Sequence, residues 1–184
     1  MTVIRAVVLG LCCANAPALA ADPLTGLKEI ALRDADGGRV VIGKIDFRPD
    51  DSGATYSIAW NEAVFADHFL SMRPFKCVEG AAKHWCHVPY PYEIRRHVTE
   101  SDLTDLEYDL LFIWKGATDY GINMWNGVYY RLTPEQDRIV GQLHEIDMDS
   151  LSAPPPTGEL RPVHASDLHE SDADSHWLPV VEIK

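Results

Sequence analysis

A short stretch of the sequence gathers four side chains that bind metals or form disulfides: Cys77, His84, Cys86 and His87. Thiolates and imidazoles are the usual ligands of Zn²⁺. In an extended strand, however, His84 and Cys86 point to one side and His87 to the other. The two cysteines also lack the Cys-x-x-Cys spacing of structural zinc sites. The pattern therefore favours a disulfide between Cys77 and Cys86 over a metal centre.

The N-terminus predicts the compartment in which this disulfide forms. Residues 1–20 carry one charge, Arg5, followed by an apolar run and the small-x-small sequence Ala18-Leu19-Ala20, which is typical of a cleaved secretory signal peptide. The run is too short, and too interrupted by Asn15 and Pro17, to span a membrane as a helix. We therefore expect a periplasmic or secreted protein in an oxidising compartment. Closing the short ring between the two cysteines is worth about 2.5 kcal/mol in the chain-entropy model.

The acidic net charge of the chain disfavours some classes of binding partner. The formal net charge is −12, and removal of the leader with its single arginine makes it −13. Such an acidic surface repels the phosphates of nucleic acids and anionic membrane surfaces. The mature chain also has no apolar stretch long enough to span a membrane. The partners we expect are an unknown small molecule or an envelope protein.

A second group of possible metal ligands lies near the C-terminus. Residues 151–176 form a Pro-rich loop that becomes acidic and histidine-rich, with His164, His169, Asp172 and His176 as candidate ligands. Imidazoles and carboxylates at this density can capture Zn²⁺, Cu²⁺ or Ni²⁺. The segment has no His-Glu-x-x-His motif. Its composition fits a solvated acidic loop better than a metal centre.

The third possible chemistry is catalysis by carboxylates or histidines, and no sequence motif supports it. The candidate acids and bases are Asp105, Glu107, Asp109, Glu145, Asp147, His97 and His144. No Gly-x-Ser-x-Gly elbow and no glycine-rich phosphate loop is present, so the sequence predicts no cofactor. Scattered acids on an acidic chain are usually surface charges. A carboxylate-based hydrolase is therefore the alternative rather than the preferred function.

Aromatic residues give the strongest indication of binding. Tyr90 lies between Pro89 and Pro91, Tyr92 follows Pro91, and Tyr120 and Trp125 lie in a Gly/Asn-rich loop. Amphipathic rings at such positions line ligand pockets and interfaces. These four residues predict the rim of a site for a small apolar or aromatic ligand or for a protein partner. We expect this binding role to be non-enzymatic.

Period-two alternation shows which elements position these residues. Apolar residues alternate over 40–47 and 54–60, and the cysteine pair sits in a further predicted hairpin. Strands are also predicted at 67–72, 108–114, 128–132 and 139–148, the last with a β-bulge near His144 because its apolar phase shifts. Residues 99–110 predict the single short helix.

The sum is a mainly β protein of about eight strands, an antiparallel β-barrel or sandwich with one short helix. Residues 21–150 form the predicted core domain, and residues 177–184 a C-terminal strand that returns to the sheet after the loop at 151–176.

Overall fold

Alternating apolar residues along the chain produce one antiparallel sheet. The structure is a computed structural model that describes residues 22–70, 74–171 and 175–184. Its strands are β1 (Gly26–Arg33), β2 (Arg39–Asp50), β3 (Gly53–Trp60), β4 (Ala66–Phe69), β5 (Pro74–Glu79), β6 (Lys83–His87), β7 (His97–Val98), β8 (Phe112–Gly116), β9 (Gly127–Glu135), β10 (Arg138–Ile146), β11 (His169–Glu170) and β12 (Val180–Ile183). The mainly β, antiparallel fold with few helices is confirmed, with twelve strands where about eight were expected.

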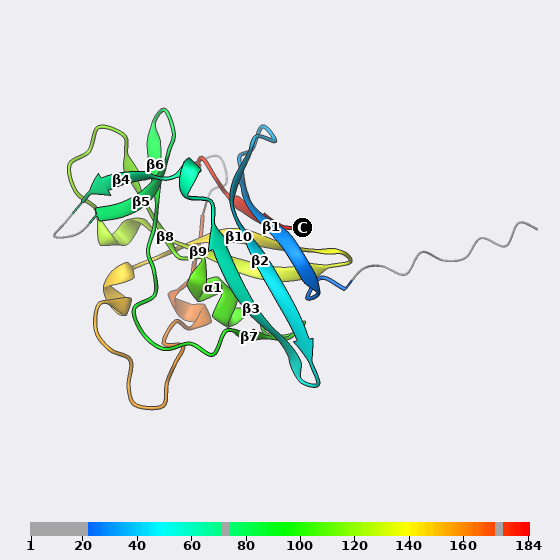
Figure 1. Cartoon of the computed structure of the whole chain (residues 1–184). Coiled ribbons are helices and arrows are strands. Elements are labelled where there is room, and N and C mark those ends of the chain that lie inside the picture. The colour runs from blue at the N-terminus through cyan, green and yellow to red at the C-terminus, as the bar shows by residue number, and fades with distance from the viewer. Residues whose placement is uncertain (1–21, 71–73, 172–174) are drawn as a thin grey trace, which may run out of the picture.

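The sheet curls strongly along its strand order, which runs β4-β5-β6-β8-β9-β10-β12-β1-β2-β3-β7 (Figure 1). Six strands separate β3 from β6 in this order, yet the ring of Trp60 in β3 lies 4.3 Å from that of His87 in β6. The two parts of the sheet therefore face each other across the interior. Among the described residues the end strands β4 and β7 do not pair with each other.

Apolar side chains form two clusters, one on each face of the sheet. The inner cluster joins residues from most strands to the helical segment, whose Leu103, Leu106 and Leu110 are buried in it. The outer cluster lies under the chain that follows β6 and the long loop after β10. Its buried members include Cys77, Cys86, Tyr90, Tyr108, Leu111, Ile113, Tyr129, Ile146, Met148 and Leu151. The second face is thus covered by irregular chain rather than left in solvent.

The helix is shorter than the sequence predicts. The helix α1 spans Thr104–Asp109, and its first turn is preceded by a bonded turn between Thr99 and Asp102 rather than by a cap at Ser101. The strand β7, which immediately precedes that turn, pairs with β3. The strand expected from residue 108 begins at Phe112, because the helix occupies the residues before it.

The C-terminal strand returns to the sheet as predicted. The strand β12 lies between β10 and β1 and pairs with both. The β-bulge expected near His144 is absent, since β9 and β10 keep one register from Arg138 to Ile146. The apolar phase shifts there for another reason: Leu143 faces the inner cluster, whereas Ile146 faces the outer one.

The predicted cysteine hairpin is present. Cys77 and Cys86 are directly opposite in β5 and β6 and form a disulfide. Both residues are buried in the outer cluster. The predicted signal peptide, residues 1–20, lies outside the described residues. In the described part of the chain, no helix has the length and apolar character needed to cross a membrane.

Candidate functional site

Two of the four predicted rim residues line an apolar cleft. Tyr90 and Tyr92 lie in the chain after β6 and contact each other edge to face, with ring centroids 5.4 Å apart. Tyr90 also packs against Tyr108 of α1 and donates its hydroxyl to the carbonyl of Leu160, in the long loop, at 3.2 Å. Flanking prolines keep this segment extended, so both rings point to the same region.

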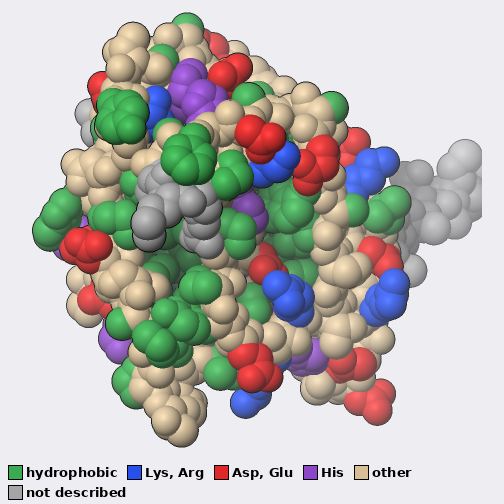
Figure 2. Space-filling view, turned by 60° about the vertical axis from the view of Figure 1, so that its left-hand side comes forward, with side chains coloured by type: hydrophobic (Ala, Val, Ile, Leu, Met, Phe, Trp, Pro, Cys, Tyr) green, Lys and Arg blue, Asp and Glu red, His purple; other side chains and the backbone are tan. Residues whose placement is uncertain are grey.

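The cleft itself has a volume of about 180 Å³. Its lining side chains are mostly apolar and come from the Tyr90 segment, from Leu111 just before β8, and from the 3₁₀ helices η2 (Met124–Asn126) and η3 (Met148–Leu151). The lining residues are Val88, Pro89, Tyr90, Pro91, Tyr92, Leu111, Met124, Met148, Leu151 and Ser152. Figure 2 shows hydrophobic side chains exposed in several places on one face of the molecule.

The other two predicted rim residues do not line the cleft. Tyr120 is fully exposed, and Trp125 is 67% exposed. Trp125 nevertheless follows Met124, whose side chain forms part of the wall. Two of the four predicted aromatic residues therefore line the cleft, and Tyr120 and Trp125 do not.

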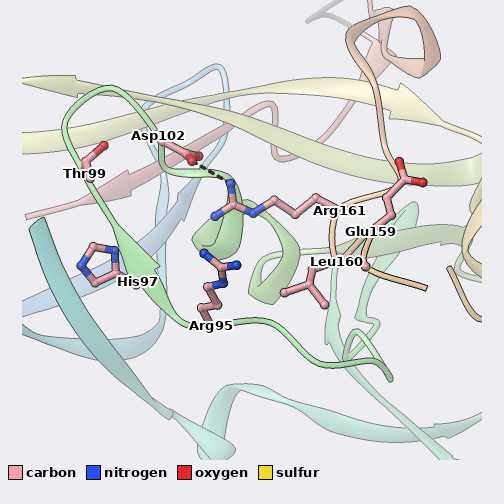
Figure 3. Close-up of a pocket in the computed structure, with 8 residues that line it drawn as sticks. Arg95, His97, Thr99, Asp102, Glu159, Leu160 and Arg161 are labelled. Atoms are coloured by element: carbon pink, nitrogen blue, oxygen red, sulfur yellow. Dashed lines mark hydrogen bonds and ion pairs between the residues drawn. The ribbon is translucent and has the colours of Figure 1, made fainter. Parts of the chain in front are cut away.

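A larger pocket, of about 350 Å³, is polar (Figure 3). Arg95 and Arg161 point into it, with Asp102, His97 and Glu159 on its walls. Arg161 is held by Asp102 at 2.6 Å and by the buried Asp105 at 2.6 Å. The positive and negative charges of this pocket largely cancel, so it has no strong preference for an ion of either sign.

The candidate catalytic acids of α1 each have a structural partner. Asp109 binds Arg96 through two contacts at 3.0 Å and accepts the hydroxyl of Tyr56 at 2.9 Å. Glu107 accepts the hydroxyl of Tyr129 and the backbone N–H of Leu132. Its burial raises the pKa of Glu107.

The remaining candidate acids and bases also have contacts of their own. Asp105 accepts the backbone N–H of His97 and is paired with Arg161. The His97 ring lies 3.2 Å from Asp50, and the His144 ring bonds the carbonyl of Gln142 at 3.2 Å. The side chain of Asp147 caps η3. The acids of α1 thus fasten the helix to β3, to β9 and to the long loop.

The three histidines of the loop at 151–176 lie in different surroundings. His164 lies 3.6 Å from Glu159, His169 is exposed in β11, and Asp172 is outside the described residues. His176 is buried, with Nε2 at 2.8 Å from Glu145 and its ring against two tryptophans. Within the described ranges, none of the three histidines belongs to a cluster with metal-ligand spacing.

A different cluster does have that spacing. His68 in β4, Glu79 in β5 and His84 in β6 each offer one ligand atom, and these atoms lie within 4.8 Å of one another. His68 Nε2 is 2.9 Å from Glu79 Oε1, and the two imidazole centroids are 4.8 Å apart. Histidine side chains gather beside an acidic side chain in the upper part of Figure 2, where β4 to β6 lie.

Sequence reasoning considered His84 only together with the cysteines and missed His68 and Glu79. The sequence did contain a signal for Glu79. Once Cys77 pairs with Cys86, the same register places Glu79 opposite His84, on the same face of the hairpin. The approach of His68 has no such signal, because it depends on how β4 is placed beside β5.

Comparison of the chain with protein-family models, with curated proteins and with solved structures finds no match. Function is therefore argued from the chain's own residues.

Proposed function

We propose that this protein is an exported, non-enzymatic domain that binds a small ligand with one apolar ring in the cleft under Tyr90 and Tyr92. The observation that carries the proposal is that two rings predicted from the sequence to form a binding rim line an apolar cleft. A concave apolar site with few polar groups is the usual form of a small-molecule site.

The size of the cleft sets the class of ligand. Sites for drug-sized ligands have volumes of about 300–1,000 Å³, whereas this cleft has about 180 Å³. A single aromatic or alicyclic ring fits this volume, and a long lipid chain does not. We therefore favour ring-sized ligands over lipids.

The chemistry of the walls agrees with a ring. Tyr90 and Tyr92 already meet edge to face, which is the geometry that a further ring can extend. Met124 and Met148 supply flexible thioethers that pack well against aromatic rings. The Tyr90 hydroxyl is committed to Leu160, so the cleft selects for apolar shape more than for hydrogen bonding.

An extracytoplasmic location, periplasmic or secreted, supports the same role. The disulfide between Cys77 and Cys86 is compatible with an oxidising compartment, and the leader-like residues 1–20 predict export. An acidic domain outside the cytosol can meet small neutral or cationic ring compounds without repelling them.

Hydrolysis by paired carboxylates is the other function class that the sequence suggests. Asp105, Glu107 and Asp109 are the candidate acids on α1, and arginines, tyrosines or backbone N–H groups engage all three. A catalytic acid needs a free path to its substrate. These contacts therefore favour a binding role.

The test is a titration of the mature protein with indole, p-cresol and cyclohexanol, followed by NMR of isotope-labelled methionine methyl groups. We expect saturable shifts of the Met124 and Met148 signals with at least one of these probes. Tyr92→Ala, which removes part of the wall, should weaken binding, whereas Tyr120→Ala, on a fully exposed ring off the cleft, should not. Absence of any shift with all three probes would overturn the proposal.

A further inference from the structure

The corner formed by β4, β5 and β6 carries a second site, which does not depend on the cleft. None of its three residues, His68, Glu79 and His84, lines the cleft. Their ligand atoms come from three neighbouring strands of the sheet, two of which are joined by the disulfide. A site built on paired strands is held more firmly than one built on loops.

His84 is the residue that most needs a further partner. Its side chain is buried, with 9% of the residue exposed, and its Nδ1 atom has no hydrogen-bond partner among the described residues. Because buried polar atoms are nearly always bonded, this nitrogen is a candidate for an external partner. An imidazole nitrogen offers the lone pair by which histidine binds metal ions.

Glu79 and His68 complete the set of donors. Glu79 lies directly opposite His84 across the hairpin, and His68 Nε2 is 2.9 Å from the Glu79 carboxylate. The Glu79 side chain is 56% exposed and that of His68 21% exposed, so solvent reaches the cluster from one side. Two imidazoles and one carboxylate with an open side match the three protein ligands and one water of an open zinc site.

We propose that His68, Glu79 and His84 form a binding site for a divalent transition-metal ion, with Zn²⁺ as the ion that fits best. Imidazole donors exclude the hard ions Mg²⁺ and Ca²⁺, which take oxygen ligands. Ligands of one Zn²⁺ ion lie about 2.0–2.1 Å from it. Side-chain rotation within the cluster, whose ligand atoms are already within 4.8 Å, brings the three donors to that distance.

One charge opposes the ion. Lys115 in β8 lies opposite His84 and is buried, with its ammonium group donating to the carbonyl of Gly116 at 2.9 Å. A buried cation so close repels Zn²⁺, while the carboxylate of Glu79 attracts it. Replacement of Lys115 by methionine keeps most of the side-chain volume and removes the repulsion. This variant should therefore bind the metal more tightly.

The test is calorimetric titration of metal-free mature protein with Zn²⁺. We expect one ion per chain, affinity reduced roughly tenfold or more in His68→Ala, Glu79→Gln and His84→Ala, and increased affinity in Lys115→Met. His68→Ala is the safest of these for folding, because its side chain is partly exposed. Circular dichroism of each variant checks that the fold is kept.

His164→Ala and His169→Ala are the matched controls, since both remove exposed histidines outside the cluster. They should bind Zn²⁺ like the unmodified protein. The proposal is overturned if no stoichiometric binding occurs, or if the three cluster variants bind Zn²⁺ as tightly as the unmodified protein. Ring binding in the cleft is measured by a separate NMR titration. Failure of one proposal therefore does not decide the other.

Discussion

The Asp105 carboxylate at the start of α1 lies 2.7 Å from Nε and 2.6 Å from Nη2 of Arg161 in the long loop. Asp105 is 1% exposed, and it also accepts the backbone N–H of His97. A single buried carboxylate thus ties together the helix, β7 and a loop that the sequence presents as solvated. This contact explains why the loop after β10 packs on the sheet.

Replacement of Arg161 by leucine should destabilise the protein by about 3 kcal/mol, because it leaves Asp105 buried without its countercharge. The free energy of unfolding from urea titrations measures this. Arg48→Leu is the control, since the Arg48–Asp46 pair is exposed and such pairs are worth about 1 kcal/mol or less. Adding Asp105→Asn to Arg161→Leu should recover part of the loss. Equal effects of Arg161→Leu and Arg48→Leu would contradict this role of Asp105.

Glu107 gives a pH dependence with a defined sign. Its pKa is raised by burial above the value of about 4.3 found in unfolded chains. The folded state therefore holds the proton more tightly, and this group lowers stability as the pH rises through the interval between the two values. Glu107→Gln removes that titration. The stability of the variant relative to the unmodified protein should increase as the pH rises above about 4.3, the value in unfolded chains. A difference that stays constant with pH would show that the Glu107 pKa is not raised.

His87 should give a pH dependence of stability with the opposite sign, because its pKa is lowered by burial. Its ring packs against that of Trp60 at a tilt of 45°, and Nε2 donates to the carbonyl of Asp109 at 3.0 Å. Burial lowers its pKa below the value of about 6.5 of unfolded chains. The stability that depends on neutral His87 is full above that value and declines as the pH falls below it. The free energy of unfolding of His87→Gln, measured from pH 7 to pH 5, should fall less steeply than that of the unmodified protein. Equal slopes for the two proteins would contradict this prediction.

Strands with one buried face were predictable from the sequence. Tyr56 and Ile58 alternate with polar residues because β3 has one side on the inner cluster. The extent of α1 was not predictable in this way. Thr99 and Asp102 bond each other in a turn just after β7, and the helical spacing of the leucines does not reveal that turn.

The candidate sites likewise differ in whether they depend on local sequence or on long-range contacts. Tyr90 and Tyr92 were found because prolines on both sides keep the segment extended, which is a local property. The loop at 151–176 was predicted to be solvated from its polar composition, yet Leu168 and Val163 pack on the outer cluster. Its few apolar residues, and the arginine that meets Asp105, determine its position more than its average composition does. His68 and Glu79 come together only through the pairing of strands.

Removal of the disulfide should lower the free energy of unfolding by about 2.5 kcal/mol, because the unfolded chain gains the freedom that the closed ring denies it. Cys77→Ala/Cys86→Ala is the variant, and urea unfolding is the measurement. Both cysteines are buried, so part of the loss comes from the sulfur atoms removed from the outer cluster. A reductant separates the two effects, since it opens the ring and leaves the sulfur atoms in place. It should destabilise the unmodified protein and leave the double variant unchanged, and a reductant effect on both would mean that the ring is not the source of stability.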